Sequence, residues 1–89
     1  MKVEIDKSFK KDLKKLKNSS LNKKVAELIE TLTGLDSPKE ISDIKKLKGE
    51  KHLYRIRIGE YRLGLEILED RLTLIRCLHR KDIYKHFPK

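Results

Sequence analysis

The first part of the chain changes its hydrophobic period once. Val3 and Ile5 alternate with charged residues, which predicts a short half-buried strand. Phe9, Leu13 and Leu16 are then spaced by four and three residues, as on one stripe of an α-helix. The rest of this segment is charged and rich in lysine, so the helix is expected to bury one face and leave the other in solvent.

A second amphipathic helix is expected after the polar break at residues 18–20. Its apolar stripe keeps the 3.6-residue period and consists of Leu21, Val25, Leu28, Ile29 and Leu32. Asp6 or Ser8 can cap the first helix, the polar break can cap the second, and Gly34 offers a left-handed stop. Two successive helices with a short connection predict a helical hairpin.

The second half of the chain follows the period of a β-sheet. The expected strands are residues 53–58, 61–68 and 71–78. Gly59 and Glu60 can form a tight turn between the first two, and the third is apolar on both faces, as in an inner strand. Residues 35–44, which include Pro38, are expected to form a loop that can include a short turn. The sequence therefore predicts one α+β domain over residues 1–89, with an N-terminal strand, a helical hairpin and a three-strand antiparallel meander in a small twisted sheet.

The chain is strongly basic. Lysine and arginine number 23 against 14 aspartate and glutamate, which gives a net charge of +9. Such an excess points to a polyanion as partner, and nucleic acid is the first candidate. Basic and acidic blocks alternate along the chain, so the positive face is expected to combine segments that are distant in sequence.

Several classes of protein are disfavoured by what the sequence lacks. It has no glycine-rich phosphate loop, no His/Cys metal spacing and no serine elbow, so we expect no metal and no cofactor. The one cysteine, Cys77, allows no intramolecular disulfide and lies in an apolar strand, where an inert buried thiol is expected. With no apolar signal region and no stretch of about 20 apolar residues, we expect a cytoplasmic protein without membrane contact.

Three arginines are expected to gather on one face of the β-hairpin. The period of two places Arg55 and Arg57 on the same face, and Arg62 follows the turn on the strand that pairs with theirs. Like charges held this close repel one another, which a fold tolerates most readily where a polyanion neutralises them. Guanidinium groups suit a phosphate clamp, although a solvated basic face is the simpler alternative.

The segment after the last strand carries an imidazole, a guanidinium and a phenol at His79, Arg80 and Tyr84. Histidine is the side chain that most readily exchanges a proton near neutral pH, which makes His79 a candidate general acid or base. An ordinary surface histidine is the simpler alternative. Tyr84 and Phe87 can either stack on a nucleic-acid base or pin the tail onto the core.

Three strings of residues form one recognisable pattern: LKG at 47–49, LYRIRIGEYR at 53–62 and LHRKDIY at 78–84. Together with the length, the basicity and the order of elements, they resemble the RelE branch of the RelE/ParE superfamily of bacterial and archaeal type II toxins. The resemblance covers essentially the whole chain. It implies a cognate antitoxin whose acidic or amphipathic segment masks the basic face. It also implies entry into the ribosomal A site and cleavage of the bound mRNA by attack of a ribose 2′-hydroxyl on the adjacent phosphate, without a metal.

The resemblance implies roles for residues that match the motif. Phosphate and transition-state charge are assigned to Arg55, Arg57, Arg62 and Arg80, and Tyr84 is assigned to stacking on or orienting the substrate nucleotide. Basic residues near these positions are added as phosphate-binding candidates, namely Lys46, Lys48 and Lys81.

The general base is the open point of this assignment. Some family members carry lysines at the positions of Arg55 and Arg57, and an arginine is a poor base because its pKa exceeds about 12. His79 is therefore the candidate base or acid, with Glu66 as the weaker alternative and catalysis by positioning and electrostatics as another. Two alternative functions stand beside mRNA cleavage: a ParE-like inhibitor of DNA gyrase and a non-catalytic RNA-binding module.

Overall fold

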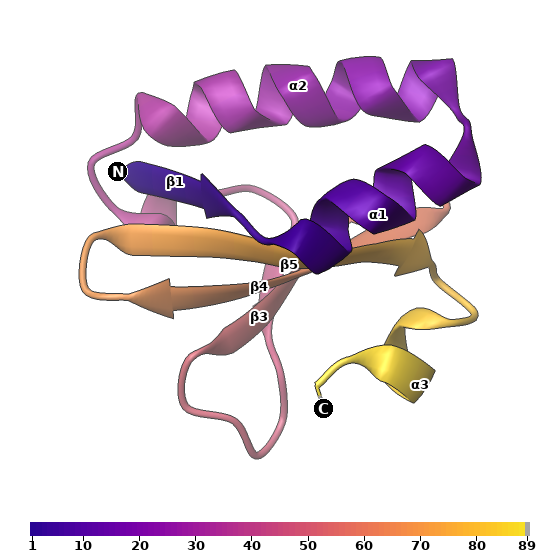
Figure 1. The fold of residues 1–89 in the computed structure, drawn as a ribbon. Coiled ribbons are helices and arrows are strands. Elements are labelled where there is room, and N and C mark those ends of the chain that lie inside the picture. Colours follow the sequence, from indigo (N-terminus) through magenta and orange to yellow (C-terminus); the bar gives the residue numbers. More distant parts are fainter. Residues whose placement is uncertain (89) are drawn as a thin grey trace.

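The computed structural model describes residues 1–88, which form one mixed five-stranded sheet with helices on both of its faces (Figure 1). The elements in chain order are β1 (Lys2–Ile5), α1 (Lys7–Leu16), α2 (Ser19–Thr33), the 3₁₀ turn η1 (Pro38–Glu40), β2 (Ile44–Lys46), β3 (Leu53–Ile58), β4 (Tyr61–Leu68), β5 (Arg71–His79) and α3 (Ile83–His86). The strand order in the sheet is β1-β5-β4-β3-β2. β1 runs parallel to β5, and the other neighbours are antiparallel.

This architecture confirms the predicted α+β fold, the helical hairpin and the β3-β4-β5 meander. Two short elements were not predicted. The loop expected over residues 35–44 contains a short turn, η1, and its last residue begins β2. β2 and α3 have three and four residues, too few for a hydrophobic period to show in the sequence. Tertiary pairing with β3 and packing against the sheet stabilise them instead.

Side-chain caps fix the ends of the two long helices. Asp6 caps α1 by accepting a hydrogen bond from the Ser8 N–H at 3.3 Å, and Asn18 caps α2 by accepting one from Leu21 at 3.0 Å. The left-handed stop expected at Gly34 is wrong, because this residue has φ −84. Lys17 instead takes the left-handed conformation, with φ 49, at the end of α1. The tight connection between the helices therefore depends on Lys17 and Asn18.

The sheet has a large core on one face and a small one on the other. The large core lies beneath α1 and α2, and its fully buried members include Phe9, Leu32, Leu63, Leu65, Leu72 and Leu74. The small core lies where α3 packs, and it joins Leu47, Ile83 and Phe87 to Leu53, Ile75 and Leu78. The C-terminal tail, which the sequence left open between pinning and stacking, is thus anchored to the sheet.

Helix α1 closes an open edge of the sheet. β1 pairs with β5 only as far as Leu74, so the later part of β5 has no neighbouring strand on that side. Asp12 on α1 lies against this edge, where its Oδ2 accepts the Cys77 N–H at 2.9 Å. The same carboxylate receives the Arg76 guanidinium through two hydrogen bonds of 2.8 and 3.1 Å, which raise the pKa of Arg76. Asp12 therefore satisfies a buried backbone donor and a cation at once.

Cys77 is fully buried, as expected, and its burial raises the pKa of the thiol to about 12. We predict that the folded protein shows no free thiol toward a disulfide reagent at pH 8 and one per chain in denaturant. Because the folded thiol keeps a proton that the unfolded thiol releases near pH 9, the free energy of unfolding should fall between pH 9 and 12. Rapid labelling of the native protein would contradict this assignment.

Candidate functional site

The register of the β-hairpin brings the three predicted arginines to one face of the sheet. Arg57 pairs directly with Arg62, and Arg55 pairs with Gly64 one step further along. This face lies opposite the helical hairpin and is the face against which α3 packs (Figure 1). Arg57 also forms an exposed ion pair with Asp43 at 3.4 Å, which neutralises part of its charge.

Arg62 lies at the centre of the cationic cluster. Burial lowers the pKa of its guanidinium, and repulsion from Arg55 and Arg57 lowers this pKa further, with a weaker contribution from Arg80. The guanidinium donates hydrogen bonds to the carbonyls of Gly59 at 2.9 Å and Tyr61 at 3.0 Å. Both acceptors are neutral carbonyls and not carboxylates. They therefore do not relieve the repulsion that Arg62 experiences from the other arginines.

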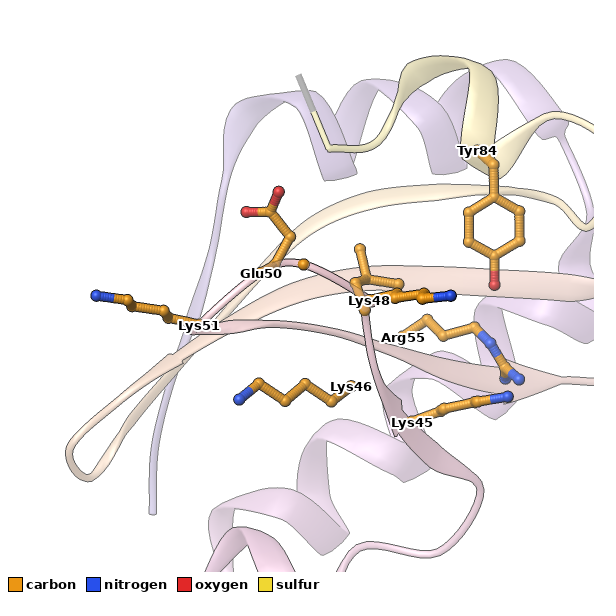
Figure 2. Close-up of a pocket in the computed structure, with 9 residues that line it drawn as sticks. Lys45, Lys46, Lys48, Glu50, Lys51, Arg55 and Tyr84 are labelled. Atoms are coloured by element: carbon orange, nitrogen blue, oxygen red, sulfur yellow. The ribbon is translucent and has the colours of Figure 1, made fainter.

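A groove of about 690 Å³ borders this cluster. It is lined by residues 45–51 together with Arg55 and Tyr84. Figure 2 shows the charged ends of Lys45, Lys48 and Arg55 directed toward the end of the groove where the Tyr84 hydroxyl lies, whereas Lys46 points the other way. The structure thus places predicted Lys48 beside the cluster and predicted Lys46 on the wall facing away from it.

Lys45 is a residue of the site that the sequence analysis missed. It pairs directly with Arg55 across the β2-β3 ladder, so the two side chains share a face. Lys45 also lines the groove and, with Arg55 and Arg57, a smaller hollow beside it. Finding it from the sequence would have required the β2-β3 register, because Lys45 and Lys46 are chemically alike.

Tyr84 projects from the site because of the way α3 packs. Ile83 and Phe87 are four residues apart, so they lie on one side of the short helix and are buried in the small core. Tyr84, next to Ile83, points outward and is 60% exposed. An exposed phenol beside a cationic groove can stack on an unpaired base or donate a hydrogen bond to a phosphate.

Gly64 allows the tail to dock. A Cβ at this position would lie 2.7 Å from Cδ2 of the Phe87 ring, closer than carbon atoms approach. We predict that Gly64→Ala lowers the free energy of unfolding by about 2 kcal/mol, because the new methyl group displaces the Phe87 ring from its packed position. Gly34→Ala is the matched control, since its Cβ would meet only ordinary contacts at 3.6 and 3.9 Å. Urea unfolding measures both, and equal stabilities would contradict the packing argument.

Arg80 joins the cluster from the end of β5. Its backbone N–H donates to the Glu60 carbonyl at 2.8 Å, and its Nε lies 3.2 Å from Glu60 Oε1. The side chain is 55% exposed, so a ligand can reach the guanidinium. Glu60 holds Arg80 near the β3-β4 turn, and a phosphate of a ligand could replace this carboxylate.

His79 lies at the margin of the cluster, where its Nε2 is 3.9 Å from Glu60 Oε1, the oxygen that also holds Arg80. It pairs with Tyr61, whereas Arg62 pairs with Leu78, so His79 and Arg62 lie on opposite faces of the sheet. The imidazole packs edge-on against the Tyr61 ring at 5.7 Å, and its Nδ1 accepts the Lys81 N–H at 3.2 Å. The register therefore separates His79 from Arg62, and its role as general base stays a prediction. The chemistry of the imidazole made His79 a candidate, and the β4-β5 register, which the sequence does not reveal, places it on the other face.

Two further predicted residues lie at the margin of the site. Glu66 shares the face of Arg62, as its parity suggested, but it pairs with Leu53 and lies beyond Gly64, over which the Phe87 ring packs. Lys81 is exposed in the turn before α3. Neither residue lines the groove next to Tyr84.

Two kinds of feature are absent from the part of the chain that the structure describes. Within residues 1–88, no three His, Cys, Asp or Glu side chains gather as metal ligands would. No helix in the same range combines the length and the apolar character needed to cross a membrane.

Comparison with known proteins agrees with the resemblance seen in the sequence. Residues 3–84 match a family model described as the ParE toxin of the type II toxin-antitoxin system parDE. Toxin RelE3 of Methanocaldococcus jannaschii is 43% identical over 89 residues, which cover 99% of this chain and all of that protein. The putative toxin RelE1 of the same organism is 49% identical over 81 residues, covering 90% of this chain and 89% of that protein.

Solved structures show the same fold. The RelB-RelE antitoxin-toxin complex from Methanococcus jannaschii contains a chain that superposes with a TM-score of 0.81 at 40% identity, covering 96% of this chain and 99% of that one. The archaeal RelE-RelB complex from Pyrococcus horikoshii gives a TM-score of 0.71 at 26% identity, covering 89% and 93%. On the evidence of sequence and fold together, the chain belongs to the RelE/ParE superfamily and is a toxin of a type II toxin-antitoxin system.

Proposed function

We propose that this toxin is an endoribonuclease that cleaves mRNA bound in the ribosomal A site. The observation that supports the proposal most strongly is the convergence of four arginines and an exposed tyrosine beside one groove: Arg55, Arg57, Arg62, Arg80 and Tyr84. The names of the relatives, RelE3 and RelE1, favour the same branch of the superfamily. Mutual repulsion among these cations is relieved when a phosphate backbone enters the groove.

The proposed reaction is an internal transesterification. The ribose 2′-oxygen attacks the adjacent phosphorus and loses its proton, the bond to the 5′-oxygen of the next nucleotide breaks, and that oxygen gains a proton. The products are a 2′,3′-cyclic phosphate and a 5′-hydroxyl. Arg62, at the centre of the cluster, is assigned to stabilise the extra negative charge of the transition state. Tyr84 is assigned to orient the nucleotide so that its 2′-oxygen lies in line with the bond that breaks.

No side chain of this chain is assigned as the general base. His79 lies on the other face of the sheet, and the arginines hold their protons too tightly. Catalysis here is proposed to rest on positioning and charge stabilisation, with proton transfer left to water or to groups of the ribosome. The rate should therefore respond more to the loss of an arginine than to the loss of the imidazole.

Lys45 is proposed as an additional phosphate-binding residue, and its neighbour provides the control. We predict that Lys45→Gln slows cleavage by about tenfold, the worth of one charge-assisted hydrogen bond to a phosphate. Lys46→Gln removes the same charge from a side chain directed away from Tyr84, and the rate should stay within about twofold of the parent. Single-turnover cleavage on programmed ribosomes measures both. Equal effects would show that only net charge matters.

The toxin is also proposed to bind a cognate antitoxin through its basic face. The support comes from charge, and from the solved RelB-RelE and RelE-RelB complexes of its relatives. An acidic amphipathic segment laid over the arginines would block the groove and neutralise their repulsion. The melting temperature should rise in the complex, since a partner that binds only the folded toxin stabilises it.

A cell-free translation reaction tests the enzymatic proposal. The purified toxin is added to a defined message, and RNA ends are mapped by primer extension on ribosome-bound and on naked message. Cuts confined to A-site codons of ribosome-bound message are expected. Binding of free RNA without cuts under any condition would instead support the non-catalytic RNA-binding module. Adding a metal chelator to the same reaction tests whether cleavage needs a metal ion.

Inhibition of DNA gyrase is the second candidate function. The match of residues 3–84 to the ParE family model favours it specifically. It predicts loss of supercoiling at stoichiometric toxin while mRNA on ribosomes stays intact. This pair of results would overturn the ranking, because a gyrase inhibitor acts through protein contacts and does not need a phosphate groove.

A further inference from the structure

Helix α1 carries a second basic surface that the proposed reaction does not use. Six lysines between residues 7 and 17 are all exposed: Lys7, Lys10, Lys11, Lys14, Lys15 and Lys17. At 100° per residue the five lysines within the helix fall on the side opposite its core-facing stripe of Phe9, Leu13 and Leu16, and Lys17 follows as the C-cap. We refer to these six side chains as the lysine surface.

Little of the charge of the lysine surface is neutralised within the described chain, where Asp6 at the N-cap interacts with Lys7. The one acidic residue of α1, Asp12, is buried and already holds Arg76. Among the ion pairs of residues 1–88, none involves a lysine of this surface. The first turn of α1 contains no acidic residue, and Lys7 lies there, where the helix dipole disfavours a positive charge. Lys14 and Lys15 lie in the last turn, where the dipole favours them, but lysines four residues apart on one helix face repel one another, which points to a role outside folding.

The position of this surface is fixed by the fold. Asp12 bonds to the edge of β5 through Arg76 and the Cys77 N–H, which prevents α1 from rolling about its axis. α1 packs on the face of the sheet that carries the large core, whereas α3 packs on the other face (Figure 1). The groove lies beside Tyr84 of α3. An RNA strand held in the groove cannot also lie along the lysine surface without wrapping around the domain.

We infer that the lysine surface binds the sugar-phosphate backbone of ribosomal RNA and holds the toxin on the ribosome while the opposite face engages the message. A protein partner would need an apolar anchor at the centre of its interface. In residues 1–88 the exposed large hydrophobic side chains are Ile5, Leu68 and Tyr84, and none of them lies on α1. Ammonium groups without such an anchor bind phosphates through their charge and do not distinguish one nucleotide sequence from another.

This inference rests on the proposed action at the ribosome and assigns separate roles to the two basic surfaces. The arginine face is responsible for chemistry on the message, and the lysine surface for affinity to the ribosome. Removing lysines should therefore weaken binding and leave the rate at saturating ribosomes almost unchanged. Removing arginines should have the reverse effect.

The test compares two variants of equal net charge. One replaces Lys10, Lys11, Lys14 and Lys15 with glutamine, a good helix former that keeps α1 intact. The control replaces four other exposed lysines with glutamine, namely Lys2, Lys23, Lys24 and Lys39. Binding of each protein to purified 70S ribosomes is measured at several salt concentrations, and single-turnover cleavage is measured at saturating ribosomes. Poly-L-glutamate serves as an acidic polypeptide probe.

The α1 variant is expected to bind ribosomes roughly 10- to 100-fold more weakly, with a reduced dependence on salt, while the control stays close to the parent. Its cleavage rate at saturation should stay within about twofold of the parent rate. Equal losses in both variants, or a loss toward poly-L-glutamate but not toward ribosomes, would overturn the inference. If the parent binds ribosomes through these lysines but cuts no message, the proposed function fails and the inference stands. If it cuts message and the α1 variant binds unchanged, the reverse holds.

Discussion

Replacing Asp12 with alanine is expected to lower the free energy of unfolding by about 3 kcal/mol, because the change removes one partner of a buried ion pair. Asp12 is only 7% exposed, and it bonds to Arg76 and to the Cys77 N–H. Without the carboxylate, a guanidinium and a backbone donor at the edge of β5 are left unsatisfied. The loss should appear as a lower midpoint in urea unfolding.

Two control variants separate the contributions of Asp12. Asp12→Asn keeps an acceptor for the Cys77 N–H, so its loss should be smaller than that of Asp12→Ala. Glu4→Ala removes the carboxylate of an exposed pair, Glu4–Arg71 at 3.9 Å, and should cost under about 1 kcal/mol. If Asp12→Ala proves no more destabilising than Glu4→Ala, the edge of β5 does not depend on α1 in the way described.

Arg80→Ala is expected to reduce cleavage of ribosome-bound message by roughly 10²- to 10³-fold, the usual effect of removing one group that stabilises transition-state charge. The folded state should change little, because the side chain is exposed and its one ion pair is with exposed Glu60. Single-turnover rates at saturating ribosomes give the effect on chemistry, and the melting temperature checks the fold.

Arg71 provides the matched control for Arg80. It begins β5, whereas Arg80 follows its last residue, and both side chains are 55% exposed and paired with a glutamate. Arg71→Ala removes the same charge at the far end of the strand and should leave the cleavage rate within about twofold. An unchanged rate in Arg80→Ala, or equal losses in both variants, would remove Arg80 from the proposed site.

The C-terminal tail links the stability of this small domain to its proposed site. Ile83 and Phe87 complete the second core, and the same short helix presents Tyr84 to the groove. The Phe87 ring packs directly over Gly64, so Gly64→Ala should lower the stability of the fold and also disturb the orientation of Tyr84. A partner that covers this face would therefore contact the elements that both stabilise the domain and line its groove.

The sequence alone determined the elements that repeat a hydrophobic period several times. The two long helices, the three strands of the meander and the shared face of Arg55 and Arg57 follow from local spacing, which a single chain reveals. The motif around these residues was also enough to indicate the family, because its residues are close in sequence and chemically specific.

The tertiary structure decided what depends on register between segments distant in sequence. β2 is too short to show a period, so only its pairing with β3 places Lys45, and not Lys46, beside Arg55. His79 and Arg62 belong to different strands, and the β4-β5 register places them on opposite faces. The buried role of Asp12 likewise arises from the open edge of β5, which no local pattern encodes. A one-residue shift in register exchanges the two faces of a strand, and that physical fact separates what the sequence determined from what it could not.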